Sequence, residues 1–287
     1  MAIQTQTTTR NEDTITSLVE DRYKDNITFM TFPFNETPPP ALQTILQHRS
    51  IRSFLPTALP RGTLEALAAA GQSASTTSML QTWNMIAIQD HSHKGTIAKI
   101  SGDQAFIHQA PLFLIFCPNL NRMTNLIRKH DQSKDRMESI DMLLVSTIDA
   151  TLAGQNVAIA AEALGLGICF VGGVRNNAAE LTKLLKLPDD TCPLFGMAIG
   201  YADTSIKEDI KPRLPMKEVL HYETWDDAGQ EENIAVFDKV LSSHYHRYLK
   251  VGRKPWSTFV ADWKADGKLD GREDMGRVLG AQGFILN

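Results

Sequence analysis

The sequence has little cysteine, no basic excess and no long apolar run. Its three cysteines, Cys117, Cys169 and Cys192, are widely spaced and form no CxxC pair. This argues against a disulfide framework or a cysteine-rich zinc site and favours a reducing, cytoplasmic location. Lysine and arginine number 29 against 33 acidic residues, a formal charge of -4, so we expect no nucleic-acid partner. A run of about 18 apolar residues is missing, so we expect no membrane span or membrane partner.

Several catalytic signatures are also missing. The chain contains no GxxxxGKS/T, no GxSxG and no HExxH, and Gly165-Leu-Gly167 lacks the third glycine of a dinucleotide-binding turn. These absences disfavour a P-loop kinase, a serine hydrolase, a zincin and a Rossmann dehydrogenase. The pairs His91-x-His93 and His244-x-His246 have no third clustered ligand, so no metal site is expected.

The 287 residues are 43% hydrophobic, which allows a large packed core. Short apolar segments predict strands over residues 83–89, 112–117, 168–171 and 193–201. Apolar spacing of three and four predicts helices over 13–24, 41–47, 61–73, 139–164, 229–250, 257–265 and 274–282. Long helices mixed with separated strands predict an α+β fold in three layers.

Four segments carry side chains that suit a bound ligand, although each also has an ordinary structural explanation. Residues 48–54 combine cations and hydroxyls, which suit phosphate or ring carbonyls but equally a solvated basic turn. Residues 73–78 are small and mostly hydroxylic, as in many loops. Residues 170–177 lead from a strand into two glycines, where a backbone can approach a flat ligand or simply turn. Residues 211–213 hold two cations apart by a proline, as a surface loop also can.

In this order and spacing, the segments resemble the nitroreductase superfamily of FMN enzymes. The similarity is greatest to the oxygen-insensitive NADPH nitroreductases and NADPH–flavin oxidoreductases. The matching strings are HRSIRSF (48–54), the hydroxyl loop through MLQ (75–81), GQNVAIAAEALGLG (154–167), FVGGVRNN (170–177), LTKLLKLPDDTCPLFGMAIGYA (181–202) and KPRLP (211–215).

The resemblance covers about residues 41–285 and implies a particular architecture. It implies a central, mostly antiparallel sheet flanked by helices, in an intertwined homodimer with two FMN molecules bound between the subunits. Residues 1–40 are then an N-terminal extension, and residues 41–287 form the FMN-binding domain with a C-terminal helical excursion.

The resemblance also implies the residues of the flavin site. Arg52 is expected near the N1/O2 edge of the flavin, where a cation stabilises the reduced ring, and the backbone N–H of Gly172 or Gly173 is expected to face N5. Arg52 and Gly172 are therefore the catalytic candidates. The full set of expected FMN-binding residues is His48, Arg49, Ser50, Arg52, Thr76, Thr77, Gln81, Gln104, Phe170, Val171, Gly172, Gly173, Lys211 and Arg213.

The implied activity is a ping-pong, two-electron reduction of nitroaromatics, quinones or similar small acceptors by NAD(P)H. The basic residues Arg247, Lys250 and Arg253 suit the 2′-phosphate of NADPH, with NADH as the alternative reductant. Two other functions stay open. One is an NADPH-dependent flavin reductase that supplies reduced FMN to a partner monooxygenase. The other is a non-catalytic flavin-binding protein, which the retained Arg52 and the basic stretch disfavour.

Overall fold

The computed structural model describes residues 14–24, 37–133, 137, 139–206, 209–248, 252–265, 269 and 271–284. The chain divides into two compact units. The helical unit consists of Met1–Arg49 and Lys207–Asp266. The sheet unit consists of Ser50–Ile206 and Gly267–Asn287.

Within the described residues, the sheet unit holds one sheet of four strands in the order β1-β2-β4-β3. The strands are β1 (Trp83–Ile88), β2 (Leu112–Pro118), β3 (Gly167–Val171) and β4 (Phe195–Gly200). All three strand pairings are antiparallel, with Ile88 opposite Phe113, Leu114 opposite Met197, and Ile168 opposite Ile199. The four strands predicted from the sequence are confirmed, each within two residues of its predicted bounds.

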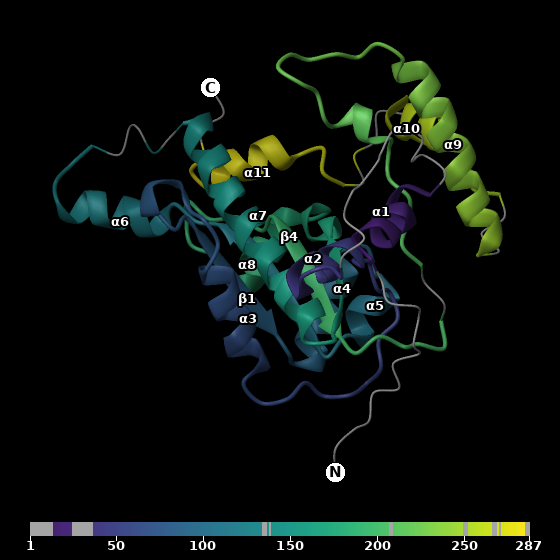
Figure 1. The fold of residues 1–287 in the computed structure, drawn as a ribbon. Coiled ribbons are helices and arrows are strands. Elements are labelled where there is room, and N and C mark those ends of the chain that lie inside the picture. Colours follow the sequence, from purple (N-terminus) through teal and green to yellow (C-terminus); the bar gives the residue numbers. More distant parts are fainter. Residues whose placement is uncertain are drawn as a thin grey trace. The chain divides into compact units, whose positions relative to one another are not determined.

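Central strand β2 is buried on both faces and therefore separates two cores. On one face, Phe113 and Ile115 pack in a core with residues of α4, α5 and α8. On the other, Leu114 and Phe116 pack in a core with residues of α3 and α7. These helices are α3 (Thr63–Gln72), α4 (His91–Ile100), α5 (Ala105–Gln109), α7 (Ile140–Ala163) and α8 (Ala178–Leu185). Each fully buried large apolar side chain contributes about 1.5–3 kcal/mol to the free energy of folding. Helices thus cover both faces of the sheet, and the predicted three-layer α+β arrangement is confirmed (Figure 1).

Helix α7 is the longest element of the sheet unit. It begins where the Ser139 hydroxyl accepts a hydrogen bond from the N–H of Met142, and it ends before Gly165, which has a φ of 77°. By length and composition α7 could cross a membrane, but 39% of its 18-residue apolar stretch is buried inside the protein. A core helix meets the same criterion, and α7 packs along β1, β2 and β3.

Among its described residues, the sheet unit also contains two one-turn helices and two further α-helices. Cys192 and Phe284 join Leu120 and Met137 in a small third cluster near the C-terminal segment. These elements are the one-turn helices η2 (Thr77–Met79) and η3 (Gly172–Arg175), and the helices α6 (Asn121–Lys129) and α11 (Met275–Ala281).

The helical unit contains four α-helices predicted within a few residues of their observed bounds, and the one-turn helix η4, which was not predicted. The Thr14 and Ser17 side chains form a capping box at the start of α1. Ser257 donates its N–H (3.0 Å) and its hydroxyl (2.5 Å) to the carboxylate of Asp238, which ties α10 to α9. The elements are α1 (Ile15–Tyr23), α2 (Pro40–Leu46), η4 (Met216–Glu218), α9 (Gln230–Arg247) and α10 (Trp256–Ala265).

Candidate functional site

The segment that follows Arg49 runs beside strand β3. Ser50 forms a parallel bridge with Ile168, and the N–H of Ile51 donates to the carbonyl of Ile168 at 2.8 Å. Ile51 is buried against Gly167, where an added Cβ would lie 2.7 Å from the Ile51 side chain. Arg52 is the next residue and is exposed, so its guanidinium is available at the edge of β3.

The turn after β3 brings two predicted site residues together. An added Cβ on Gly173 would lie 2.3 Å from the carbonyl oxygen of Ser101 and 3.2 Å from Nε2 of Gln104. Only glycine fits this approach. The Gln104 amide donates to the same Ser101 carbonyl at 3.4 Å. The side chain of Val171 is 2% exposed, so only its backbone can reach a ligand.

Two arginines that were not among the predicted site residues lie at the same turn. The Nη2 atoms of Arg175 and Arg272 lie 3.3 and 3.7 Å from where a Cβ on Gly172 would be. Arg175 donates to the carbonyl of Leu194, and Arg272 Nε donates to Oδ1 of Asn176 at 3.0 Å. Burial and then the charge of Arg272 lower the pKa of Arg175. Guanidinium groups stay protonated in proteins, so two positive charges meet here and favour an anionic group. Arg175 follows the double glycine in sequence, whereas no local pattern points to Arg272.

The hydroxyl loop is anchored to α7 by Asp149, which the sequence analysis missed. The Asp149 carboxylate accepts hydrogen bonds from the Thr76 hydroxyl (2.6 Å), the Thr77 N–H (3.0 Å), and the N–H and hydroxyl of Thr82 (3.0 and 2.9 Å). Burial by itself raises the pKa of Asp149, but these hydrogen bonds outweigh burial and hold it below its usual value. The only signal in the sequence is a carboxylate within a strongly apolar helical pattern.

The backbone of the hydroxyl loop is held in an unusual conformation. Ser78, Met79 and Gln81 have positive φ values of 47°, 58° and 52°. Non-glycine residues adopt this region only when the surroundings enforce it, and such strain gathers at functional sites. The N–H of Gln81 donates to Thr76 Oγ1 at 2.8 Å, which closes the loop.

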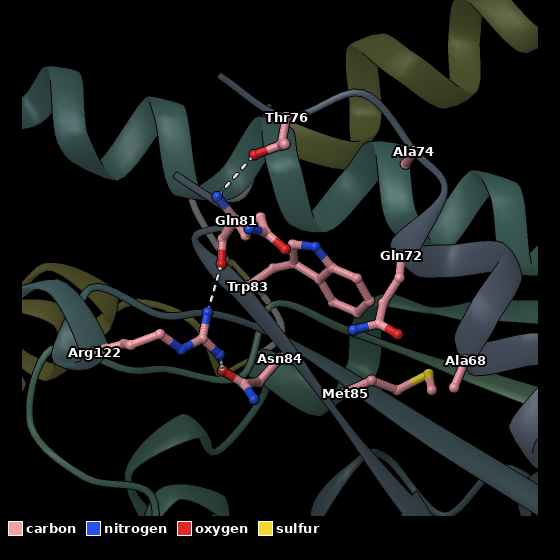
Figure 2. A pocket seen from close by; sticks show the side chains of 9 residues that line it. All are labelled: Ala68, Gln72, Ala74, Thr76, Gln81, Trp83, Asn84, Met85 and Arg122. Carbon is pink, nitrogen blue, oxygen red and sulfur yellow. Dashed lines mark hydrogen bonds between the residues drawn. The ribbon is translucent and has the colours of Figure 1, made fainter. Parts of the chain in front are cut away.

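A pocket of about 250 Å³ opens beside this loop and contains two of the predicted residues, Thr76 and Gln81. Figure 2 shows Arg122 reaching from α6, with Nη1 donating to the Gln81 carbonyl at 2.8 Å and Nη2 to Asn84 Oδ1 at 3.2 Å. The indole of Trp83 also faces this pocket. The full lining is Ala68, Gln72, Ala74, Thr76, Gln81, Trp83, Asn84, Met85 and Arg122.

In the helical unit, the two segments predicted to bind phosphate meet through Arg22. Nη2 of Arg22 donates to the carbonyl of His48 at 2.9 Å, and the N–H of Arg213 donates to the carbonyl of Arg22 at 3.2 Å. Arg49 and Arg213 are exposed, and Arg213 Nη1 donates to the carbonyl of Lys211 at 3.1 Å. The structure thus brings His48 and Arg213 to one place in this unit.

Two of the three residues predicted to bind the NADPH phosphate are also in the helical unit. The Arg253 guanidinium lies 5.9 Å from the centroid of the ring of Tyr245, which is on α9. Arg247 is the last residue of α9 and comes two residues after Tyr245. Arg253 follows α9 in the chain, and its contact with Tyr245 places its guanidinium over a ring of that helix. Lys254 forms an ion pair with Asp262 at 2.5 Å. Lys250 lies outside the described residues.

Comparison with known proteins identifies the family. The profile "Nitroreductase family" matches residues 45–201, more than half of the chain, and "Nitroreductase family, C-terminal domain" matches residues 211–287. A Bacillus subtilis protein named "FMN reductase (NADPH)" is 39% identical over 229 residues, which cover 77% of this chain and 90% of that protein. The "Oxygen-insensitive NADPH nitroreductase" of Salmonella typhimurium is 34% identical over 223 residues, which cover 77% and 89%. The solved structure of NfrA1 nitroreductase from Bacillus subtilis has a TM-score of 0.80 and 33% identity, covering 86% of this chain and 100% of that chain. The chain therefore belongs to the nitroreductase family, as its motifs predicted.

Proposed function

We propose that this chain is an FMN-dependent NAD(P)H oxidoreductase that reduces nitroaromatics, quinones or similar small acceptors in two-electron steps. The observation that carries the proposal is the turn after β3, where two glycines meet a glutamine and two arginines. These residues are Gly172, Gly173, Gln104, Arg175 and Arg272. The names of the two relatives, each of which includes NADPH, support the same activity.

The residues at this turn fit the flavin ring of FMN. Gly172 has no Cβ, so a flat ring can approach its backbone beside the guanidiniums of Arg175 and Arg272. The amide of Gln104 can pair with the pyrimidine edge of the ring, and the exposed Arg52 can stabilise negative charge on it. When bound, FMN supplies two-electron transfer between a nicotinamide and an acceptor.

The phosphate end of FMN requires cations and hydroxyls, and the predicted set provides both. Arg49 and Arg213 present exposed guanidiniums, whose planar forks match phosphate oxygens. His48, Ser50 and Lys211 complete this set. Thr76, Thr77, Gln81, Phe170 and Val171 are the further proposed contacts, with Thr76 acting partly through the loop shape that its hydroxyl maintains.

We propose NADPH as the preferred reductant, with NADH as the alternative. Arg247, at the end of α9, and Arg253, whose guanidinium lies 5.9 Å from the ring of Tyr245 on the same helix, supply positive charge that suits the additional phosphate of NADPH. Lys250 is proposed as a third contact on its sequence position alone.

We also propose that the protein acts as a homodimer. Along α7, the side chains of Ile140, Leu144, Ile148 and Leu152 follow a four-residue spacing and remain 40 to 53% exposed. That spacing places them on one face of the helix, and an exposed apolar row is typical of an interface. The pocket of about 250 Å³ is smaller than the range of roughly 300–1,000 Å³ for ligand sites, which supports completion by a second copy. Sedimentation of the wild type should give a dimer, and a monomer would contradict this proposal.

Two organisational proposals accompany this function. Residues 1–40 are an extension of an FMN-binding domain at 41–287, which is supported by profile matches that begin at residue 45. The enzyme works in the cytoplasm on small molecules, and its three buried, free cysteines are consistent with a reducing compartment.

The direct test is the visible spectrum of the purified protein during anaerobic titration with NADPH and then with a nitroaromatic. The flavin absorbance should bleach with the first and return with the second. A protein that remains colourless after incubation with FMN would overturn the proposal. A yellow protein that NAD(P)H cannot bleach would instead indicate a non-catalytic flavin-binding protein.

A second function remains a candidate because one relative bears the name "FMN reductase (NADPH)". In that role the enzyme would supply reduced FMN to a partner monooxygenase. Turnover with free FMN, compared with turnover with a nitroaromatic at matched concentrations, separates the two roles. A large excess of FMN turnover would favour the flavin reductase.

A further inference from the structure

Helix α1 contains a buried arginine that contacts both segments proposed to bind phosphate. The helix spans Ile15–Tyr23 and lies outside both matched family profiles, which cover residues 45–201 and 211–287. Leu18, Val19 and Arg22 are its buried residues. Arg22 is 9% exposed, which is unusual for an arginine and requires hydrogen-bond partners.

The guanidinium of Arg22 joins the last residue of α2 to His48, two residues further along the chain. Its Nη2 donates to the carbonyl of Leu46 at 2.8 Å and to the carbonyl of His48 at 2.9 Å. Leu46 is the last residue of α2, and carbonyls at a helix C-terminus have no partner within the helix. A cation there satisfies the carbonyl and also the helix dipole. Arg22 therefore holds the backbone at the start of the basic motif.

The same end of α1 also holds the second phosphate segment. The carbonyl of Arg22 accepts a hydrogen bond from the N–H of Arg213 at 3.2 Å. Lys24 Nζ lies 3.8 Å from a carboxylate oxygen of Asp209, just before that segment. Asp209 is fixed in turn by hydrogen bonds from the N–H of Ile210 and from the Tyr248 side chain.

We propose that Arg22 is a positioning residue for the phosphate of FMN. It holds His48 and Arg213 in one arrangement through main-chain contacts, without touching the cofactor itself. Cations that are already ordered bind phosphate at a lower entropic cost than cations on mobile segments. This inference rests on the proposed function, because it assumes that these segments receive FMN.

The test compares two flavins that differ only in the phosphate. Arg22→Met keeps a long apolar side chain but removes the hydrogen-bond donors. We expect the Kd of the apoprotein for FMN, measured by quenching of flavin fluorescence, to rise about tenfold. The Kd for riboflavin, which has no phosphate, should change by less than about twofold. A purely structural role would weaken both flavins equally.

Three further variants make the result specific. Arg22→Lys provides a single cationic point in place of a planar fork, so it should restore part of the FMN affinity. Arg128→Ala, an exposed arginine on α6, should leave both Kd values unchanged. If circular dichroism shows that Arg22→Met does not fold, Lys24→Ala provides the test instead. This variant removes the contact between Lys24 and Asp209 and leaves Arg22 in place. It should show a smaller loss with the same preference for FMN.

The outcomes separate this inference from the function on which it rests. Equal losses for FMN and riboflavin, or no loss for either, would overturn the role of Arg22 while the wild type still binds FMN. A wild type that binds neither flavin would overturn the proposed function and this inference together.

Discussion

The hydroxyl of Thr76 donates a 2.6 Å hydrogen bond to the carboxylate of Asp149, in the middle of α7. The Asp149 side chain is buried, and its carboxylate is surrounded by donors from the hydroxyl loop and from Thr82. A loop with several strained residues is thereby fastened to the longest helix of the sheet unit. The shape of the neighbouring pocket depends on this fastening.

Asp149→Asn should destabilise the protein. The amide nitrogen introduces a donor where the native carboxylate oxygens face only donors, so at least one buried N–H or hydroxyl loses its acceptor. We expect the free energy of unfolding in urea to fall by about 2–3 kcal/mol. Asp189→Asn, at an exposed position, is the matched control and should change it by less than about 0.5 kcal/mol. Equal stability of the Asp149 variant and the wild type would show that these hydrogen bonds contribute nothing.

The stabilising effect of Asp149 should depend on pH. Its pKa in the folded state lies below the ordinary value, so the ionised carboxylate favours folding above the pKa of the unfolded chain. That contribution is lost as the pH falls from near the unfolded value, about 3.9, through the folded pKa. The stability difference between wild type and Asp149→Asn should therefore be constant from about pH 7 to pH 5 and shrink below about pH 4. Urea unfolding across this range measures it, and a difference that grows in acid would contradict the assigned direction.

Gly173→Ala should displace the turn after β3. Its Cβ would lie 2.3 Å from the Ser101 carbonyl oxygen, so the backbone must move. We expect FMN affinity to fall by about tenfold or more, together with a stability loss of about 1–3 kcal/mol. Gly280→Ala is the control, because nothing lies within 4 Å of its added Cβ and it sits inside α11. That variant should be slightly more stable than the wild type, by about 0.5–1 kcal/mol. Unchanged FMN binding in Gly173→Ala would show that this turn is not part of the flavin site.

Arg272→Met should lower the catalytic efficiency with acceptors that carry a polar, electron-rich group. It removes one of the two guanidiniums beside Gly172 and so about one charge-assisted hydrogen bond. We expect kcat/KM for a nitroaromatic to fall about tenfold, while kcat/KM for NADPH changes little. Arg277→Met serves as the control, because Arg277 lies on α11 and forms an ion pair with the nearby Asp274. An equal fall for both substrates would indicate a general structural effect.

Replacing Arg247 and Arg253 together by alanine should alter the choice of reductant. The lost contacts concern the 2′-phosphate, so kcat/KM for NADPH should fall by about tenfold to a hundredfold, whereas that for NADH should stay nearly constant. Steady-state kinetics with both reductants provide the measurement. Equal losses for NADPH and NADH would refute the coenzyme assignment.

The elements that were predicted well follow strictly local rules. The predicted helix over 139–164 matches α7, because its apolar spacing follows the helical repeat and Gly165 ends it. The predicted strand over 112–117 matches β2 within one residue. The predicted helix over 229–250 is longer than α9, which ends at Arg247.

The candidate site was predictable only in part. Gln104 and Gly173 were both expected and lie together in the structure. Asp149 and Arg272 were not expected. No local sequence pattern predicts the hydrogen-bond partners of an aspartate inside a helix or of an arginine in a loop near the C-terminus.

The sequence by itself determined the four strands, the two longest helices and the family, and it predicted the segments that carry the cofactor chemistry. Backbone geometry imposes repeats of about two or 3.6 residues on buried side chains, and such repeats are readable along the chain. Only the tertiary structure decided that Thr76 meets Asp149 and that Arg22 joins His48 to Arg213. A buried polar group takes whichever partner the packing brings within about 3 Å, and that partner is often far away in the sequence.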